Sequence, residues 1–426
     1  MTGRTLRNAT CAGLLGLTVI AAGARGDDQA PAAAPAAPAS WWSSFTWSGY
    51  LDGGITGNPD DPSNGINFGH LYTDRANMPV LNQASITLTR PLDPKATGAD
   101  FGFIFQGMYG TDARFTHYFN EFDRVINSRY QFDIVEAAAL VHLPIMTSGG
   151  IDVTAGQYVT PIGYEVINPG GNPLYSHSYI YNFSIPIKHT GVQTVTHISS
   201  MVDFYLGADM GNLTWFGPKG DNNAAPFHLL TGLGFNLYDG NLTILALTHD
   251  GPENPSIPQG AFPNVNSTNR YYNDIVVTLK WNEDLTFTTE LNYTKDDTEV
   301  PGLFNHPQAY GIAQYVTYGI NDMFTLQGRG EIWRDDQGFF AAAFPANFDF
   351  TNFGRGLANT AFNAGRATYE EVTLGLNITP PGIPDMFKGL KLRPEIRYDH
   401  AAAAKPFNSL TSHNQVTIAA DIFLPF

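Results

Sequence analysis

Apolar and polar residues alternate with a period of two along much of the chain from Phe45 onward. Between 285 and 294 the odd positions are mostly apolar and the even positions polar, and 390–399 repeats the pattern with charges on its polar face. Because successive side chains of a β-strand point to opposite faces, this period predicts strands with one apolar and one polar side. Alternation and turn residues together delimit sixteen strands, at 45–52, 82–90, 101–110, 133–143, 151–158, 191–199, 202–210, 227–238, 241–249, 271–281, 285–294, 310–319, 323–333, 368–378, 389–399 and 415–426.

The connections between these strands alternate between long and short. Short ones include Asp239-Gly240, a pair suited to a type I′ hairpin, and the turns at 282–284 and 320–322. The long ones span about 53–81, 111–132, 159–190, 211–226, 250–270, 295–309, 334–367 and 400–414. Outer-membrane barrels show this asymmetry, whereas a soluble sandwich has no reason for it. We therefore predict an all-β fold, a transmembrane antiparallel β-barrel of about 16 strands with long extracellular loops and short periplasmic turns.

Hydropathy and composition favour the same fold. No stretch after the N-terminus approaches 18 consecutive apolar residues, which excludes a helical membrane protein. Only 15% of the residues are charged, against roughly 25% in soluble domains. A closed barrel satisfies every backbone group within lipid. Aromatic residues near the expected strand ends suit the headgroup level, although β-propensity alone also favours them there: Trp47, Tyr271, Trp281, Tyr293, Trp333 and Tyr398.

The N-terminus has the pattern of a secretory signal. Arg4 and Arg7 precede an apolar stretch at 11–22, and Ala22-Gly23-Ala24 supplies a small-residue cleavage site. Loss of two basic residues and no acid changes the net charge from −16 to −18, which argues against a nucleic-acid partner and permits a lumen that favours cations. The expected organisation is a signal peptide at 1–24, an Ala/Pro-rich periplasmic spacer at 25–44 and an outer-membrane β-barrel at 45–426.

The terminal strand has a sequence pattern that indicates cellular location. Its alternating apolar residues end in Ile422, Leu424 and Phe426, which resembles the signal by which outer-membrane barrels are recognised for assembly. We therefore expect export to the bacterial outer membrane, with its lipid, its lipopolysaccharide and the barrel assembly machinery as partners. A homo-oligomer is compatible with this location, but no interface can be recognised in the sequence.

The central segment from Gly156 to Gly191 resembles the signature region of the OmpL-like β-barrel porin family. In that family a glycine-bounded strand end leads through a Glu into a loop with Asn, Ser and Tyr, and a Pro-x-x-His-x-Gly element opens the next strand. The matching residues are Gly156, Gly163, Glu165, Asn172, Ser176, Tyr179, Tyr181, Pro186, His189 and Gly191. The resemblance implies an outer-membrane channel of about sixteen strands.

Motifs of catalysis are absent from the sequence. It has no His-Glu-x-x-His helix, no Gly-x-Ser-x-Gly elbow and no phosphate-binding loop. We expect no enzyme activity, no catalytic residues, no cofactor and no metal site. His189 is expected to orient the loop by hydrogen bonding rather than to bind a metal. Residues 58–62 could touch calcium, but Pro and Asp favour a solvated turn.

The polar strand faces supply candidates for the lining of a pore. In a barrel of about sixteen strands side chains cannot fill the interior, so a water channel is expected. Opposite charges across such a channel would select solutes by charge and size, although some could pair within the wall. The candidates are Lys280, Glu290, Arg329, Glu331, Lys391, Arg393, Glu395, Arg397 and Asp421.

The loop from Val159 to Thr190 is the candidate constriction, because it is long and carries both charges and tyrosines. Its tyrosines could stack sugars, form a small core of the loop's own or stand at the rim. The residues expected to act there are Glu165, Tyr175, Tyr179, Lys188 and His189.

The function expected from these features is passive diffusion of small hydrophilic solutes or ions through a water-filled porin. The alternatives are a non-conducting structural or adhesive barrel and, less favoured, a membrane-embedded hydrolase.

Overall fold

The computed structural model describes residues 41–93, 96, 98–119, 121–122, 128–215, 227–253 and 268–426. The predicted signal peptide and most of the predicted spacer lie outside these residues. Within them, no helix is both long and apolar enough to cross a bilayer.

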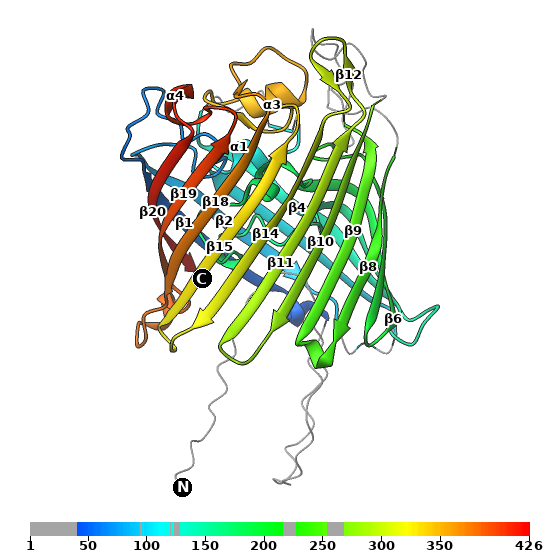
Figure 1. Ribbon diagram of the computed structural model, residues 1–426. Helices are drawn as coiled ribbons and strands as arrows, with labels where there is room; N and C mark the ends of the chain where they lie inside the picture. Colours follow the sequence, from blue (N-terminus) through cyan, green and yellow to red (C-terminus); the bar gives the residue numbers. More distant parts are fainter. Residues whose placement is uncertain are drawn as a thin grey trace.

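Sixteen antiparallel strands close into one barrel in which every strand pairs with its neighbours in the sequence (Figure 1). All sixteen predicted strands are present, which confirms the predicted fold. They are β1 (Thr46–Gly57), β2 (Pro79–Arg90), β3 (Asp100–Gly110), β4 (Gln131–Leu143), β5 (Ile151–Val159), β6 (Lys188–Ser199), β7 (Val202–Asp209), β8 (His228–Leu237), β9 (Leu242–Pro252), β10 (Asn269–Lys280), β11 (Leu285–Asp296), β14 (Gln308–Gly319), β15 (Phe324–Asp335), β18 (Ala367–Ile378), β19 (Lys391–Ala402) and β20 (Asn414–Pro425).

The remaining elements are short and lie in the connections. The helices are α1 (Ala113–Thr116), α2 (Tyr179–Phe183), α3 (Asp349–Gly354) and α4 (Phe407–Leu410), with 3-10 turns η1 (Trp41–Ser44), η2 (Pro169–Gly171), η3 (Tyr238–Gly240) and η4 (Asp385–Phe387). Two small hairpins pair β12 (Glu299–Val300) with β13 (Phe304–Asn305) and β16 (Ala342–Ala343) with β17 (Phe362–Asn363). Helices α3 and α4 and the hairpin of β12 stand at the top of Figure 1, at the end of the long loops.

Several strands extend beyond their predicted limits at the long-loop end. The strand predicted to end at residue 52 continues to Gly57, and that predicted to begin at residue 82 starts at Pro79. Glycines interrupt the alternation in these segments, so the sequence pattern fades although the ladder continues. At the opposite end, the Asp239-Gly240 turn is confirmed, since both residues have positive φ (55° and 85°) and the Asn241 N–H donates to the Tyr238 carbonyl at 3.1 Å.

The two faces of the barrel wall separate as the alternation predicts. In β19 the even residues are exposed on the outside, as Ile396 is, while the odd residues from Arg393 to Asp399 are buried inside. Trp333 corrects one expectation, because it lies fully buried in the lumen and not at a membrane interface. It shares the odd-numbered face of β15 with Arg329 and Glu331, so its position follows from the parity of the strand.

Pro394 lies on the outer face of β19 and interrupts one of its ladders. The pairing of β18 with β19 runs to Gly375↔Glu395 and resumes only at Ile378↔Leu392. Because proline lacks an N–H donor, this local gap accommodates it.

The barrel closes where β20 pairs with β1. Beyond the last strand residue, Phe426 and Gly49 exchange both backbone hydrogen bonds at 2.8 Å. The Phe426 ring covers Gly49, where a β-carbon would come within 2.5 Å of it. Phe426 is itself exposed on the outside of the barrel, as is Ile422.

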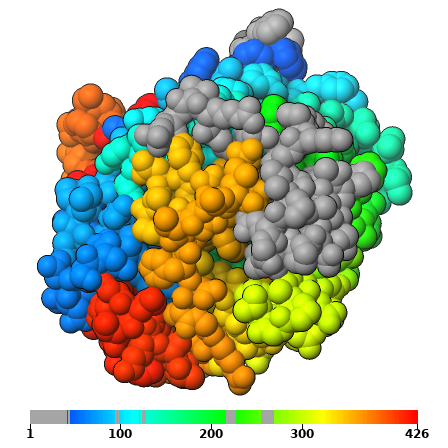
Figure 2. All heavy atoms as spheres, turned by 90° about the horizontal axis from the view of Figure 1, so that it is seen from above, coloured from blue at the N-terminus to red at the C-terminus, as the bar shows by residue number. Residues whose placement is uncertain are grey.

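The interior of the barrel holds a packed apolar cluster contributed largely by the loops. Phe68, Phe115, Tyr179 and Phe344, from four different connections, pack with Trp333 of β15 in this cluster. Figure 2 looks down on the long-loop end, where the connection between β15 and β18, in orange, lies over the middle of the opening. The lumen is therefore filled and covered at this end.

Candidate functional site

The connection between β5 and β6, residues 160–187, folds into the barrel and lies against the inner faces of β11, β14, β15, β19 and β20. A chain segment in such a place must find partners for its own backbone groups. The buried charges of the wall supply many of them. This loop, which we call the inserted loop, is the central feature of the site.

Two wall carboxylates accept hydrogen bonds from backbone amides of the inserted loop. Glu395 of β19 accepts from Tyr175 N–H at 2.8 Å and from Ser176 N–H at 3.1 Å. Glu331 of β15 accepts from Tyr179 N–H at 2.7 Å and Ile180 N–H at 2.8 Å, at the first turn of α2. Hydrogen bonds to a charged acceptor are among the stronger ones, so each carboxylate fixes one stretch of the loop.

Basic side chains of the same wall donate to the carbonyls of the inserted loop. Arg393 donates to Pro169 O at 2.6 Å, and Arg397 donates to His177 O at 2.6 Å. Arg329 donates to Ser176 O at 2.7 Å. Wall carboxylates therefore accept hydrogen bonds from the loop's amides, and wall guanidinium groups donate to the loop's carbonyls. The two sets of contacts are complementary along one side of the barrel.

Ion pairs join these groups into one network. Arg329 lies 2.8 Å from Glu165 of the inserted loop and 2.6 Å from Glu371 of β18. Arg397 pairs with Asp399 at 2.7 Å. Arg393 pairs with Asp421 in a two-pronged contact. Buried charges require such pairing, because an unpaired one would be costly.

Most of the predicted pore-lining residues meet at this network. Glu290, Arg329, Glu331, Arg393, Glu395, Arg397 and Asp421 are all buried on the lumenal side. Lys391 lies at the edge of the network and donates to Gly170 O at 3.1 Å. Lys280 does not join it, since it is exposed at the short-turn end of β10. The buried charges face inward but are covered by the inserted loop.

The predicted constriction residues divide into two groups. Glu165, Tyr175 and Tyr179 belong to the inserted loop and are buried within the barrel. Lys188 and His189 were expected in the loop, but the ladder begins earlier and places both in β6. Lys188 is fully buried and bonds both oxygens of Asp133, at 2.7 and 2.9 Å.

The tyrosines of the inserted loop act in packing. Tyr179 stacks on Trp333 and on Tyr369, with ring centroids 5.9 and 4.8 Å apart. Its hydroxyl donates to Asp399 at 2.8 Å, and that of Tyr175 donates to Asn82 at 2.8 Å. Both rings are buried, and that of Tyr179 is stacked on rings of the wall, so neither offers an exposed face to a sugar.

The family-like residues of the central segment account for the shape of the inserted loop. Asn172 closes a turn with Val166, donating to its carbonyl at 2.7 Å and accepting from its amide at 2.8 Å. Gly163 has φ of 93°, and a β-carbon there would meet the Ile185 side chain at 2.7 Å. The motif thus specifies a compact loop that packs inside the barrel.

A second set of charges ties the outer loops together above the inserted loop. Asp74 accepts from Arg114 at 3.0 Å and from Arg129 at 3.1 Å. Arg114 also donates to the carbonyl of Phe344, in the connection that lies over the opening. Burial by itself would raise the pKa of Asp74, but Arg114 and Arg129 outweigh it and lower that pKa below its usual value. Asp74 thus joins two loops as a carboxylate, and Arg114 extends the contact to a third.

The opposite wall, made of β5 to β10, is different between mid-height and its short turns. Lumenal residues such as Gln193, Thr243 and Leu245 are only half-buried there, and none of the three is charged. We call it the uncharged wall after these residues, although Asp209 of β7 and Asp274 of β10 also lie on it. Most of the charged groups that bond the inserted loop lie on β15 and β19 of the opposite wall, which we call the charged wall.

Sequence reasoning missed several members of the network. Glu371 and Asp399 lie on predicted polar strand faces. Their position on the same face as Arg397 and Glu395 would have identified them as further candidates. His70, 3.3 Å from Asp399, comes from the connection after β1 and carries no comparable signal. Asn82 accepts from the Tyr175 hydroxyl, and Gln83 donates to the carbonyl of Ile167. Neither residue belongs to a recognisable sequence motif.

A closed barrel with short turns at one end, long loops at the other and a loop folded inside it defines the class of outer-membrane porins. The chain belongs to the family described as "Putative beta-barrel porin-2, OmpL-like", whose model matches residues 44–426. It is thus a porin of the outer membrane. No curated protein matches its sequence.

Solved porins share the fold at low sequence identity. The anion-selective porin from Comamonas acidovorans has a TM-score of 0.55 at 9% identity, covering 90% of this chain and 99% of that one. The outer-membrane channel DcaP of Acinetobacter baumannii gives 0.53 at 10% identity, covering 90% and 97%. The loop-deleted form of OmpT from Vibrio cholerae gives 0.52 at 9% identity, covering 90% and 99%. At such identities the likeness concerns the fold alone.

Proposed function

We propose that this porin passes small hydrophilic solutes or ions by diffusion along the uncharged wall, and that the inserted loop sets the width of the path. The observation that carries the proposal is that most of the charged groups that anchor this loop lie on one wall, with further polar contacts from β2 and β11. Its amides and carbonyls are bonded to Glu331, Glu395 and Arg393 on the charged wall. The half-buried residues across the lumen are left to line the path. Such a channel needs no cofactor and no covalent chemistry, so we assign no enzyme activity.

Conductance of the purified protein in planar bilayers tests the proposal. Discrete, ohmic steps are expected from the mature chain. Correctly folded protein, verified by its heat-modifiable migration in SDS gels, that gives no steps would overturn the channel and favour a non-conducting structural barrel. That second function has an observation in its favour, since an apolar cluster packs inside the lumen beneath the outer loops.

Deletion of Gly170 to Ser184 tests the role of the inserted loop. Single-channel conductance is expected to rise severalfold, because the segment removed contains α2 and most of the contacts to Glu331 and Glu395. An unchanged conductance would contradict a constriction at this loop. The double variant E331Q/E395Q keeps the chain length and weakens the same anchors, so it serves where the deletion does not fold. It is expected to give a noisier and larger conductance.

Several further features are part of the proposal. Residues 1–24 direct export and are removed, and residues 25–44 span the periplasmic side. Ile422, Leu424 and Phe426 are recognised by the barrel assembly machinery, and the folded barrel contacts outer-membrane lipid and lipopolysaccharide. A homo-oligomer is included, and one solved structure of OmpT from Vibrio cholerae is described as a trimer form. Cross-linking in native membranes, followed by mass measurement of the mature chain, tests the oligomer and the cleavage site together.

A further inference from the structure

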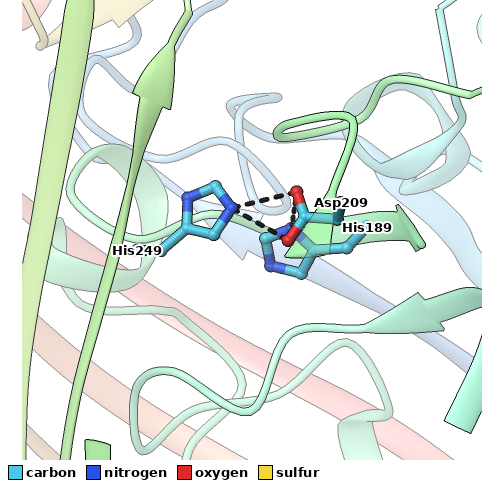
Figure 3. A group of neighbouring side chains, drawn as sticks. All are labelled: His189, Asp209 and His249. Carbon is cyan, nitrogen blue, oxygen red and sulfur yellow. Dashed lines mark hydrogen bonds and ion pairs between the residues drawn. The ribbon is translucent and has the colours of Figure 1, made fainter. Parts of the chain in front are cut away.

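A compact group of two histidines and one aspartate lies at the long-loop end of the uncharged wall. His189 comes from β6, Asp209 from β7 and His249 from β9. Figure 3 shows both imidazole rings turned toward the carboxylate. All three residues are buried, and one ligand atom from each lies within 4.8 Å of the others.

The distances from both histidines to Asp209 match those between the ligands of one metal ion. Nδ1 of His189 lies 3.3 Å from Asp209 Oδ1, and Nε2 of His249 lies 3.0 Å from the same oxygen. Zinc bonds of about 2.0–2.1 Å in tetrahedral geometry place neighbouring ligand atoms roughly 3.3 Å apart. Two imidazoles and one carboxylate also form a common ligand set for zinc, and it leaves a fourth position open.

The surroundings fix the orientation of each ligand. Nε2 of His189 is 3.1 Å from Thr160 Oγ1, which turns Nδ1 toward Asp209. Asp209 Oδ1 also accepts from Gly211 N–H at 2.8 Å. The ring of His228 stacks on that of His249 at 5.3 Å with an interplanar angle of 10°. Outer contacts of this kind hold metal ligands in place.

Two glycines make room for the group. A β-carbon on Gly191 would come within 2.6 Å of Asp209, and one on Gly251 would overlap the His228 ring at 2.1 Å. Gly191 and His189 are both members of the Pro-x-x-His-x-Gly element in the central segment. Among the matching residues of that segment, these two thus contribute to this group rather than to the shape of the inserted loop.

The electrostatics of the group favour a cation when His189 carries its proton on Nε2, whereas with the proton on Nδ1 His189 donates to Asp209 and Thr160 donates to Nε2. If the Nε2–H of His189 donates to Thr160, its Nδ1 presents a lone pair toward the carboxylate, an unfavourable contact in a buried place. A divalent ion between the three ligand atoms removes that repulsion. A proton on one imidazole does so as well, and the experiment must separate the two.

We propose that His189, Asp209 and His249 form a binding site for a late first-row divalent transition metal, with Zn²⁺ as the best-fitting ion. Imidazole ligands disfavour Mg²⁺ and Ca²⁺, which prefer oxygen. The site lies where the inserted loop leaves and re-enters the wall, since Thr160 follows β5 and His189 is the second residue of β6. A bound metal would brace both stems of the loop. The proposal does not depend on whether the barrel conducts.

The test is refolding of the full mature chain in detergent with Co²⁺ and, separately, with Zn²⁺. One Co²⁺ per chain with visible absorption bands is expected, displaced by Zn²⁺ and not by Mg²⁺ or Ca²⁺. In D209N and H249Q the bound Co²⁺ is expected to fall to near zero. Thr160→Val is expected to weaken binding by about 10- to 100-fold, as loss of the hydrogen bond that orients a metal-binding histidine does.

The matched control lies at the other end of the same strands. His197 of β6 sits between Asp203, at 2.8 Å, and Asp152, at 3.3 Å, and is partly exposed. H197Q should bind Co²⁺ as the unaltered chain does. Absence of saturable binding to heat-modifiable protein would show that a proton bridges the group and overturn the proposal. Binding that survives D209N, or that is lost in H197Q, would overturn the assignment to these residues.

Discussion

The two walls of the barrel differ in the charge and the burial of their lumenal side chains. On the wall of β15, β18, β19 and β20 many inward side chains are charged and buried, and several of them bond to the inserted loop. On the wall of β5 to β10 several inward residues between mid-height and the short turns are uncharged and half-buried. A charge on the inner face of a porin strand is therefore no sign of contact with the permeating solute. Here several of the charges position a loop, and the proposed path follows the uncharged wall.

The largest expected effect comes from breaking the network at its centre. Arg329→Met leaves Glu165 and Glu371 buried without their shared cation, and it should lower the stability of the barrel by about 3–5 kcal/mol. Gln193→Ala on the uncharged wall should change it by less than about 0.5 kcal/mol. Urea unfolding in detergent, followed by tryptophan fluorescence, measures both. Similar losses in the two variants would abolish the distinction between the walls.

Chemical labelling compares the same residue type on the two walls. Thr373 of β18 is fully buried and Thr243 of β9 half-buried, and both lie on the lumenal face. The only native cysteine, Cys11, lies in the predicted signal peptide, so each new thiol is unique. T243C should react with a small aqueous maleimide at least about tenfold faster than T373C. In the 170–184 deletion the rates should converge. Equal rates in the full chain would mean that the inserted loop does not cover the charged wall.

A smaller effect is expected at the outer loops over the charged wall. Arg114 and Arg129 lower the pKa of Asp74 in the folded protein, so the carboxylate stabilises the loops above the ordinary aspartate pKa, near 3.8. That contribution is lost as the pH falls through the lowered pKa. Loop fluctuations, seen as current noise, should therefore increase below about pH 4. Asp74→Asn should show the added noise already at pH 7 and lose the acid dependence. An acid response that persists in the variant would assign it to other groups.

The sequence predicted the wall far better than what fills it. Strand periodicity is local, so the number of strands and the parity of Arg329, Arg393 and Glu395 could be read directly. Trp333 was misplaced only because its aromatic character was given more weight than its parity. The contacts of the inserted loop are different in kind, since Tyr175 and Glu395 lie 220 residues apart. Nothing in a single sequence records which amide meets which carboxylate.

The histidine group illustrates the same limit. The residues of the group are isolated in the sequence and lie on three different strands: His189 on β6, Asp209 on β7 and His249 on β9. Strand β9 is not adjacent to β6 or β7. Their meeting depends on the register of β6 to β9 and on the curvature of the wall. The Pro-x-x-His-x-Gly element was the one visible signal, and it was assigned to loop orientation, the role that the Thr160 contact also fits.

The seam between β1 and β20 has a consequence for biogenesis. Every other strand pair is formed by successive barrel strands, so a single connection separates its two members. The seam joins Tyr50 to Pro425, across nearly the whole barrel sequence. Contacts of such long range are slow to form, and until this one exists both β1 and β20 present unpaired edges. The last pairing event therefore converts a curved sheet with two open edges into a channel wall without edges.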